Sequence, residues 1–145
     1  MKKKIIAVIG GSIVDKDIYD AAYQAGSIIA KKGYILVCGG LSGVMEAAAK
    51  GAYEHGGITI GILPGTDPKD ANPFISIPIV TGMSTARNAI IARTCDIAIV
   101  INGKYGTLTE IAYCLDFGKK VFGYKTHKVK GIIRITDISE LEKYL

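Results

Sequence analysis

Three glycine-bearing segments of the sequence combine residue types that are suited to holding an anion. They are Gly10-Gly11-Ser12, Gly39-Gly40-Leu41-Ser42-Gly43 and Gly103-Lys104-Tyr105-Gly106-Thr107. Each follows an apolar run and leads into a stretch with helical character, so each is expected where a strand passes into a helix. Glycine lets the backbone approach a ligand closely, and the first turn of a helix offers unpaired N–H groups that favour phosphate. Together the three segments predict a phosphate site.

Four polar residues near these segments are candidates for chemistry: Arg87, Asn88, Thr107 and Glu110. Thr107 and Glu110 have the spacing of a capping box, in which each side chain satisfies a backbone N–H at the start of a helix. For Glu110, this structural role and a catalytic role are equally compatible with the sequence. Arg87 lies near a predicted helix start, where a cation opposes the helix dipole. Either an acidic ligand lies nearby or Arg87 is an ordinary surface residue.

Several familiar site patterns are absent from the sequence. Gly10-Gly11-Ser12 is not the G-x-G-x-x-G of dinucleotide enzymes, and the second predicted strand ends in Cys38-Gly39-Gly40 rather than in an acidic residue for the ribose. No P-loop pattern and no G-x-S-x-G elbow occur. His55 and His127 are isolated and lack the spacing of metal ligands, so no metal site is predicted.

Strands and helices alternate along the chain, and these elements must position the glycine-bearing segments. Strands are predicted at 4–9, 34–38, 58–63, within 74–80, at 96–101 and 121–123, with a seventh within 131–136. Helices are predicted at 15–32, 44–55, through 86–93, and at 107–117 and 137–145. This alternation predicts a single Rossmann-like α/β domain over residues 1–145, with a doubly wound, mainly parallel sheet of six to seven strands and helices on both faces. Ligands of such folds bind at the edge where the strands pass into the helices.

Composition narrows the class of partner. The net charge of +5 comes largely from lysines, and we interpret them as a solvated surface, because aromatic residues are not interleaved with them as in nucleic-acid-binding proteins. Nucleic acid is therefore a distant alternative to a small anionic ligand. The three cysteines form no CxxC pair and lie in apolar stretches, which predicts buried free thiols and a cytoplasmic protein. No apolar run has the length of a membrane-spanning helix.

Four motifs occur in an order that is typical of a known superfamily. They are Gly39-Gly40-Leu41-Ser42-Gly43-Val44-Met45-Glu46-Ala47, Pro64-Gly65, Met83-Ser84-Thr85-Ala86-Arg87-Asn88 and Tyr105-Gly106-Thr107-Leu108-Thr109-Glu110. The set resembles the Lonely Guy (LOG) superfamily, and most closely its small branch with the molybdenum-cofactor carrier proteins. The resemblance extends from Ile5 to about Tyr124. The label "lysine decarboxylase", which the superfamily often carries, has no support, because no lysine stands out as a Schiff-base partner.

The resemblance implies roles for particular residues. LOG phosphoribohydrolases release the base from a nucleoside 5′-monophosphate, and the resemblance would make Arg87 and Glu110 the catalytic pair. The residues then expected to bind the ligand or its phosphate are Gly10, Gly11, Ser12, Gly39, Gly40, Ser42, Gly43, Asn88, Gly103, Lys104, Tyr105, Gly106 and Thr107. A carboxylate can stabilise an oxocarbenium-like ribose or orient water, while loop N–H groups hold the phosphate.

The sequence also departs from the enzymes of this superfamily, whose loop reads P-G-G-x-G-T-x-x-E. Asn102 replaces the proline and Lys104 replaces the second glycine. The segment Ser84-Thr85-Ala86-Arg87-Asn88 differs from the H-x-R-K of the enzymes in both spacing and end residue. Two functions stay open: a carrier or sensor of a phosphorylated ligand, and a nucleoside 5′-monophosphate phosphoribohydrolase. No cofactor is expected to be required. An AMP-like nucleotide or the molybdenum cofactor is the expected ligand, and the resemblance implies a homodimer or homotetramer.

Overall fold

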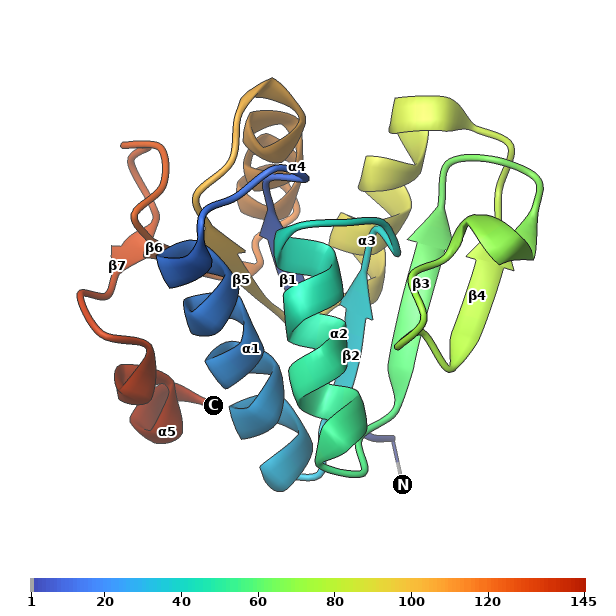
Figure 1. Ribbon diagram of the computed structural model, residues 1–145. Helices are drawn as coiled ribbons and strands as arrows, with labels where there is room; N and C mark the ends of the chain where they lie inside the picture. Colours follow the sequence, from blue (N-terminus) through green and yellow to red (C-terminus); the bar gives the residue numbers. More distant parts are fainter. Residues whose placement is uncertain (1) are drawn as a thin grey trace.

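A computed structural model describes residues 2–145 and contains one seven-stranded sheet in which all strands are parallel. The strand order is β4-β3-β2-β1-β5-β6-β7 (Figure 1). The strands are β1 (Ile5–Gly10), β2 (Ile35–Cys38), β3 (Thr59–Leu63), β4 (Ile77–Val80), β5 (Ile97–Ile101), β6 (Lys120–Tyr124) and β7 (Ile133–Arg134). The predicted Rossmann-like, doubly wound fold is confirmed.

Four α-helices connect β1 to β2, β2 to β3, β4 to β5 and β5 to β6, and within residues 2–145 they cover both faces of the sheet. The helices are α1 (Lys16–Lys31), α2 (Val44–Glu54), α3 (Asn88–Thr94), α4 (Tyr105–Asp116) and α5 (Leu141–Tyr144), with short 3-10 segments η1 (Pro68–Asp70), η2 (Ser84–Arg87) and η3 (Ile138–Glu140). Asp15 caps α1 by accepting a hydrogen bond from the N–H of Ile18, and Gly33 follows the helix with φ of +77°, as the sequence predicts. No helix within residues 2–145 is long and apolar enough to cross a membrane.

Side chains of the central strand alternate between two apolar cores. Ile6 and Val8 pack with α1 and α2 on one face, and Ala7 and Ile9 pack with α3 and α4 on the other. Figure 1 shows α1 and α2 in front of the sheet and α3 and α4 behind it. A strand buried on both faces must be apolar at every position, which explains the uninterrupted apolar run of β1.

The strand order reverses between β1 and β5, which are the two central neighbours. From β1 the chain proceeds outward through β2, β3 and β4, whereas β5, β6 and β7 follow on the other side. Gly10, the last residue of β1, lies in register with Ile101, the last residue of β5. The segments after these strands therefore leave the sheet side by side, at the switch point where ligands of such folds bind.

Helix α4 begins earlier than the sequence predicts. Its first residue is Tyr105, and the residue before it, Lys104, makes no capping hydrogen bond through its side chain. Thr107 consequently lies within the first turn instead of at the cap, so the predicted capping box of Thr107 and Glu110 is wrong. The reason is the positive φ of Asn102 and Gly103, 56° and 105°, which turns the chain into the helix within three residues of β5. The helix predicted through 86–93 begins later than expected: residues 86 and 87 belong to the 3-10 turn η2, and α3 starts at Asn88.

Candidate functional site

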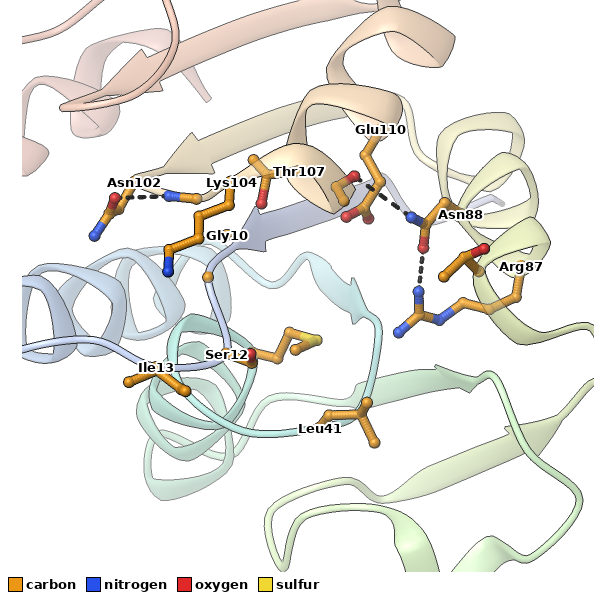
Figure 2. A pocket seen from close by; sticks show the side chains of 15 residues that line it. Gly10, Ser12, Ile13, Leu41, Arg87, Asn88, Asn102, Lys104, Thr107 and Glu110 are labelled. Atoms are coloured by element: carbon orange, nitrogen blue, oxygen red, sulfur yellow. Dashed lines mark hydrogen bonds between the residues drawn. The ribbon is translucent and has the colours of Figure 1, made fainter.

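A cavity of about 300 Å³ opens at the carboxyl ends of β1 and β5, at the switch point of the sheet (Figure 2). Its wall comes from four parts of the chain: the exits of β1, β2 and β5, and the segment around η2. The lining residues are Gly10, Gly11, Ser12, Ile13, Leu41, Met45, Thr85, Arg87, Asn88, Asn102, Gly103, Lys104, Gly106, Thr107 and Glu110. The volume is in the range of small-molecule sites.

One wall of the cavity is the first turn of α4. The N–H groups of Gly106 and Thr107, which line the cavity, precede the first residue that can bond within the helix, so they have no acceptor inside it. Figure 2 shows the hydroxyl of Thr107 directed into the cavity and the side chain of Lys104 running past Gly10 at its rim. Helix N–H groups, a hydroxyl and an ammonium group together suit an anion.

The loop that leads into α4 is held by the chain that follows β6. The side chain of Asn102 accepts a hydrogen bond from the N–H of Gly103 at 2.7 Å, and its backbone N–H donates to the carbonyl of Tyr124 at 3.1 Å. Thr126 donates to the carbonyl of Asn102 at 2.7 Å, and the ring Nε2 of His127 lies 2.9 Å from the carbonyl of Lys104. Four contacts within the protein thus hold the loop that leads into α4.

Arg87 lies in the opposite wall and is buried. Its Nε donates to the carbonyl of Ile62 at 2.8 Å and its Nη2 to the carbonyl of Gly39 at 3.4 Å, so the guanidinium joins the ends of β2 and β3. A Cβ at position 39 would lie 2.6 Å from this Nη2 and 2.7 Å from the sulfur of Met45, which explains the glycine there. Burial lowers the pKa of Arg87.

Asn88 links Arg87 to α4. Its Oδ1 accepts a hydrogen bond from Nη1 of Arg87, and its Nδ2 donates to the hydroxyl of Thr109 at 3.2 Å and the carbonyl of Gly106 at 3.5 Å. The amide thus joins the segment around η2 to the helix that presents its N-terminus to the cavity. Both donor and acceptor ends of Asn88 are engaged within the protein.

Among residues 2–145, Glu110 is the one acidic side chain in the cavity wall. It is 9% exposed, and within residues 2–145 its carboxylate has no hydrogen bond and no ion pair. Burial raises the pKa of Glu110 to about 7, and the nearby positive charge of Arg87 offsets only part of this rise. Burial therefore favours the protonated form of Glu110 relative to an exposed glutamate.

The structure brings ten of the predicted site residues into the cavity wall. They are Gly10, Gly11, Ser12, Arg87, Asn88, Gly103, Lys104, Gly106, Thr107 and Glu110. Gly39, Gly40, Ser42, Gly43 and Tyr105 lie outside the wall. Ser42 donates to the carbonyl of Ser12 at 2.9 Å and Gly43 packs against Gly11, so the second glycine segment supports the first. Tyr105 is exposed on the outer side of α4.

Sequence reasoning missed the apolar part of the wall. Ile13, Leu41 and Met45 line the cavity, as does Thr85, and each is next to or within a motif that the sequence singles out. Their types carry no chemical signal, because leucine and methionine after a strand are ordinary core residues. For Ile13, Leu41 and Met45, closeness in sequence to the glycine segments is the only signal that they line the cavity.

The fold and this site together define a class. A parallel sheet whose switch point carries Arg87 and the segment Gly-x-x-Gly-Thr-x-x-Glu, at 103–110, is a LOG-superfamily protein, near the branch of the molybdenum-cofactor carrier proteins. Within that class, the chain belongs to the SLOG cluster4 family, whose model matches residues 3–143. A protein of Archaeoglobus fulgidus is 45% identical over 141 residues, which cover 97% of this chain and 92% of that protein.

Solved structures agree with this placement. The molybdenum cofactor binding protein of Rippkaea orientalis superposes with a TM-score of 0.93 at 31% identity, covering 99% of this chain and 96% of that one. The molybdenum cofactor carrier protein of Chlamydomonas reinhardtii gives 0.90 at 31% identity with the same coverage. The cytokinin riboside 5′-monophosphate phosphoribohydrolase LOG of rice is 34% identical over 96 residues, which are 63% of this chain and 39% of the enzyme. The chain thus spans well under half of that enzyme.

Proposed function

We propose that this protein binds a phosphorylated, nucleotide-type ligand in the cavity and acts as a carrier or sensor of it, with the molybdenum cofactor as the leading candidate. The observation that carries the proposal is the first turn of α4 within the cavity wall, flanked by Lys104 and Thr107. This arrangement provides N–H groups, a hydroxyl and a cation for one phosphate. The full-length likeness to a cofactor-binding and a carrier protein supports the choice of ligand.

Two features favour carriage over turnover. The guanidinium of Arg87 is bonded to two backbone carbonyls and to Asn88, which suits a residue that braces the wall. Asn102 has φ of +56°, a conformation that proline cannot adopt, so this loop differs in backbone geometry from any loop with proline at that position. A site with altered loop geometry and a bonded arginine is suited to holding a ligand intact.

The alternative function is a nucleoside 5′-monophosphate phosphoribohydrolase. It is favoured by one specific observation: Arg87 and Glu110 both line the cavity, and Glu110 has a pKa of about 7, in the range of a general acid or base. A rice relative with that activity in its name, 34% identical over 96 residues, supports this alternative.

A ligand panel separates the two functions. Thermal unfolding of the wild-type protein is followed with nucleoside monophosphates and, under anaerobic conditions, with molybdenum cofactor, and the products are then separated by chromatography. We expect stabilisation by at least one phosphorylated ligand with no free base released. Lys104→Ala should weaken that binding about tenfold, whereas Lys143→Ala, on α5 and outside the cavity wall, should not. Release of base would establish the hydrolase, and a panel without any stabilising compound would contradict both functions.

We also propose that the protein works as a homo-oligomer in the cytoplasm. All three cysteines are buried free thiols, which suits a reducing compartment. Edge strand β4 exposes apolar side chains that a second copy would cover.

A further inference from the structure

Glu110 is the feature of the cavity that phosphate binding does not explain. A carboxylate next to an anion site repels the anion, and withdrawing most of a charged side chain from solvent costs free energy. Within residues 2–145 it accepts no hydrogen bond, although it is only 9% exposed. Arg87 is the nearby cation, yet it lies beyond ion-pair distance and bonds to Ile62, Gly39 and Asn88 instead.

The surroundings of Glu110 leave room for a ligand to provide the missing donors. Figure 2 shows Lys104, Thr107 and Glu110 in succession along one wall, with the carboxylate of Glu110 directed into the cavity. Leu41 and Met45 line the same cavity, and their apolar side chains suit the face of a flat ring. A ligand whose phosphate lies at Lys104 and Thr107 would extend its ring towards Glu110 and these apolar side chains.

A carboxylate has two acceptor oxygens, and it is best satisfied by two parallel N–H donors. A ring N–H next to an exocyclic amino group supplies such a pair. Guanine and pterin rings both present this edge, whereas the corresponding edge of adenine pairs its amino group with a ring nitrogen whose lone pair would face the carboxylate.

We propose that Glu110 selects the ligand by accepting two hydrogen bonds from a 2-amino-4-oxopyrimidine edge, the edge shared by guanine and pterin rings. The inference rests on the proposed function and adds to it the class of ring that accompanies the phosphate. Glu110 is then a specificity-determining residue that touches the ligand through its ring.

Calorimetric titration with GMP, IMP and AMP tests the proposal, because these nucleotides share one phosphate and one sugar. IMP keeps the ring N–H but lacks the amino group. Wild-type protein should bind GMP at least tenfold more tightly than AMP, with IMP between them. Glu110→Gln should weaken the affinity for GMP at least tenfold and change the affinity for AMP less than threefold. The reason is that glutamine offers one acceptor and a competing donor. Glu142→Gln, an exposed residue of α5, is the matched control and should leave all three affinities unchanged.

The outcomes distinguish this inference from the function on which it rests. Equal binding of GMP and AMP that still depends on Lys104 would overturn the edge recognition and leave phosphate binding in place. If no phosphorylated compound binds, both fail. Release of guanine by the wild type and not by Glu110→Gln would also overturn the inference, since Glu110 would then act at the glycosidic bond. The wild-type GMP-to-AMP ratio requires no variant, so the test holds even if Glu110→Gln folds poorly.

A second arm separates the two sources of the edge. A phosphorylated pterin and the matching phosphorylated lumazine, which carries an oxo group in place of the amino group, are titrated under the same conditions. Tighter binding of the pterin than of the lumazine supports the proposal if Glu110→Gln removes the difference. If the pterin also binds more tightly than GMP, the ring of the ligand is assigned to a pterin. Equal binding of pterin and lumazine would contradict it.

Discussion

At the scale of single residues, two charged groups of the cavity differ in their bonding. Within residues 2–145 the guanidinium of Arg87 is hydrogen-bonded to the protein, whereas the carboxylate of Glu110 is not. Arg87 donates hydrogen bonds to two backbone carbonyls and to the side chain of Asn88. Asn88 in turn donates to Thr109 on α4. Truncating a bonded, buried group of this kind leaves its partners unsatisfied. Substitutions at Arg87 therefore report on folding as well as on function, and the informative residues are Glu110 and Asn102.

Glu110 should make stability depend on pH. Its pKa is about 7 in the folded protein against an ordinary value of 4.5, so the folded state keeps a proton that the unfolded chain has lost between these values. Wild-type stability should therefore fall as pH rises from 5 to 8, by roughly 3 kcal/mol relative to Glu110→Gln, since each pKa unit corresponds to about 1.4 kcal/mol. Denaturation curves at several pH values measure the difference. Glu142→Gln should follow the wild type, and parallel curves for wild type and Glu110→Gln would contradict the prediction.

Asn102 should tolerate glycine and reject proline. Its φ of +56° is available to asparagine and glycine, but the ring of proline holds φ near −65°. Proline would also remove the N–H that donates to Tyr124 at 3.1 Å. We expect Asn102→Pro to lose about 2–4 kcal/mol of unfolding free energy, and Asn102→Gly to lose less than about 1 kcal/mol. Similar stability of the two variants in urea would mean that the loop adopts another conformation.

At the scale of elements, the start of α4 illustrates how a local pattern can mislead. The spacing of Thr107 and Glu110 matches a capping box, but two positive-φ residues start the helix at Tyr105. The last two turns of the chain contain a true capping box, with Asp137 and Glu140, where both side chains meet the backbone. The same four-residue spacing therefore has different outcomes, because the preceding loop decides which residue stands at the cap.

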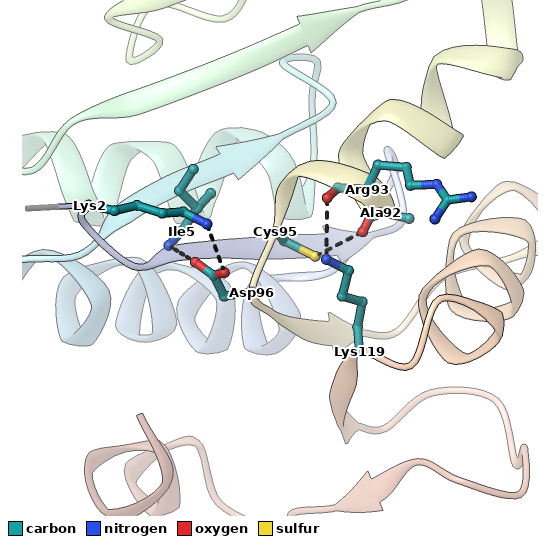
Figure 3. Close-up of polar contacts among 7 residues, drawn as sticks. All are labelled: Lys2, Ile5, Ala92, Arg93, Cys95, Asp96 and Lys119. Carbon is teal, nitrogen blue, oxygen red and sulfur yellow. Dashed lines mark hydrogen bonds and ion pairs between the residues drawn. The ribbon is translucent and has the colours of Figure 1, made fainter.

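The start of the central strand offers an element-scale prediction. The carboxylate of Asp96, just before β5, accepts a hydrogen bond from the N–H of Ile5 at 2.8 Å and lies 3.6 Å from the ammonium of Lys2 (Figure 3). Asp96→Ala should cost about 1–2 kcal/mol, because the half-buried N–H loses its acceptor. Lys2→Ala should change stability by less than about 0.5 kcal/mol, because that ion pair is exposed. Asp96→Asn keeps an acceptor for this N–H, so its stability in thermal unfolding should be close to that of the wild type. If Asp96→Asn is as unstable as Asp96→Ala, the loss comes from the negative charge and not from the hydrogen bond.

At the scale of the whole molecule, edge strand β4 of the sheet exposes apolar side chains. Ile77, Ile79 and Met83 are 45%, 43% and 46% exposed, on and just after β4, where the sheet ends. An apolar sheet edge of this kind invites pairing with another chain. The proposed second copy would cover it.

Light scattering after size exclusion tests this assembly. The wild type should elute as a dimer or tetramer at micromolar concentration, and Ile79→Lys should shift it towards the monomer while circular dichroism stays unchanged. Tyr53→Lys, an exposed aromatic on α2, serves as the control and should keep the wild-type mass. A monomeric wild type would contradict the assembly, and an unchanged Ile79→Lys would place the interface elsewhere.

The sequence by itself determined the class of fold and the edge of the sheet at which the cavity lies. Apolar runs, helical periodicity and glycines at strand ends are local properties, and parallel strands bring their carboxyl ends together whatever the remaining details. Arg87, Asn88, Thr107 and Glu110 could be singled out for the same reason, since their motifs are local.

Only the tertiary structure decided which groups face the cavity and which are already bonded. Gly39 to Gly43 turn out to support the wall, Ile13, Leu41 and Met45 join it, and Glu110 is left without a partner in the described chain. These facts depend on contacts between β1, β2, α3 and α4, which are far apart in sequence. Burial and hydrogen bonding are properties of that packing, and no local pattern encodes them.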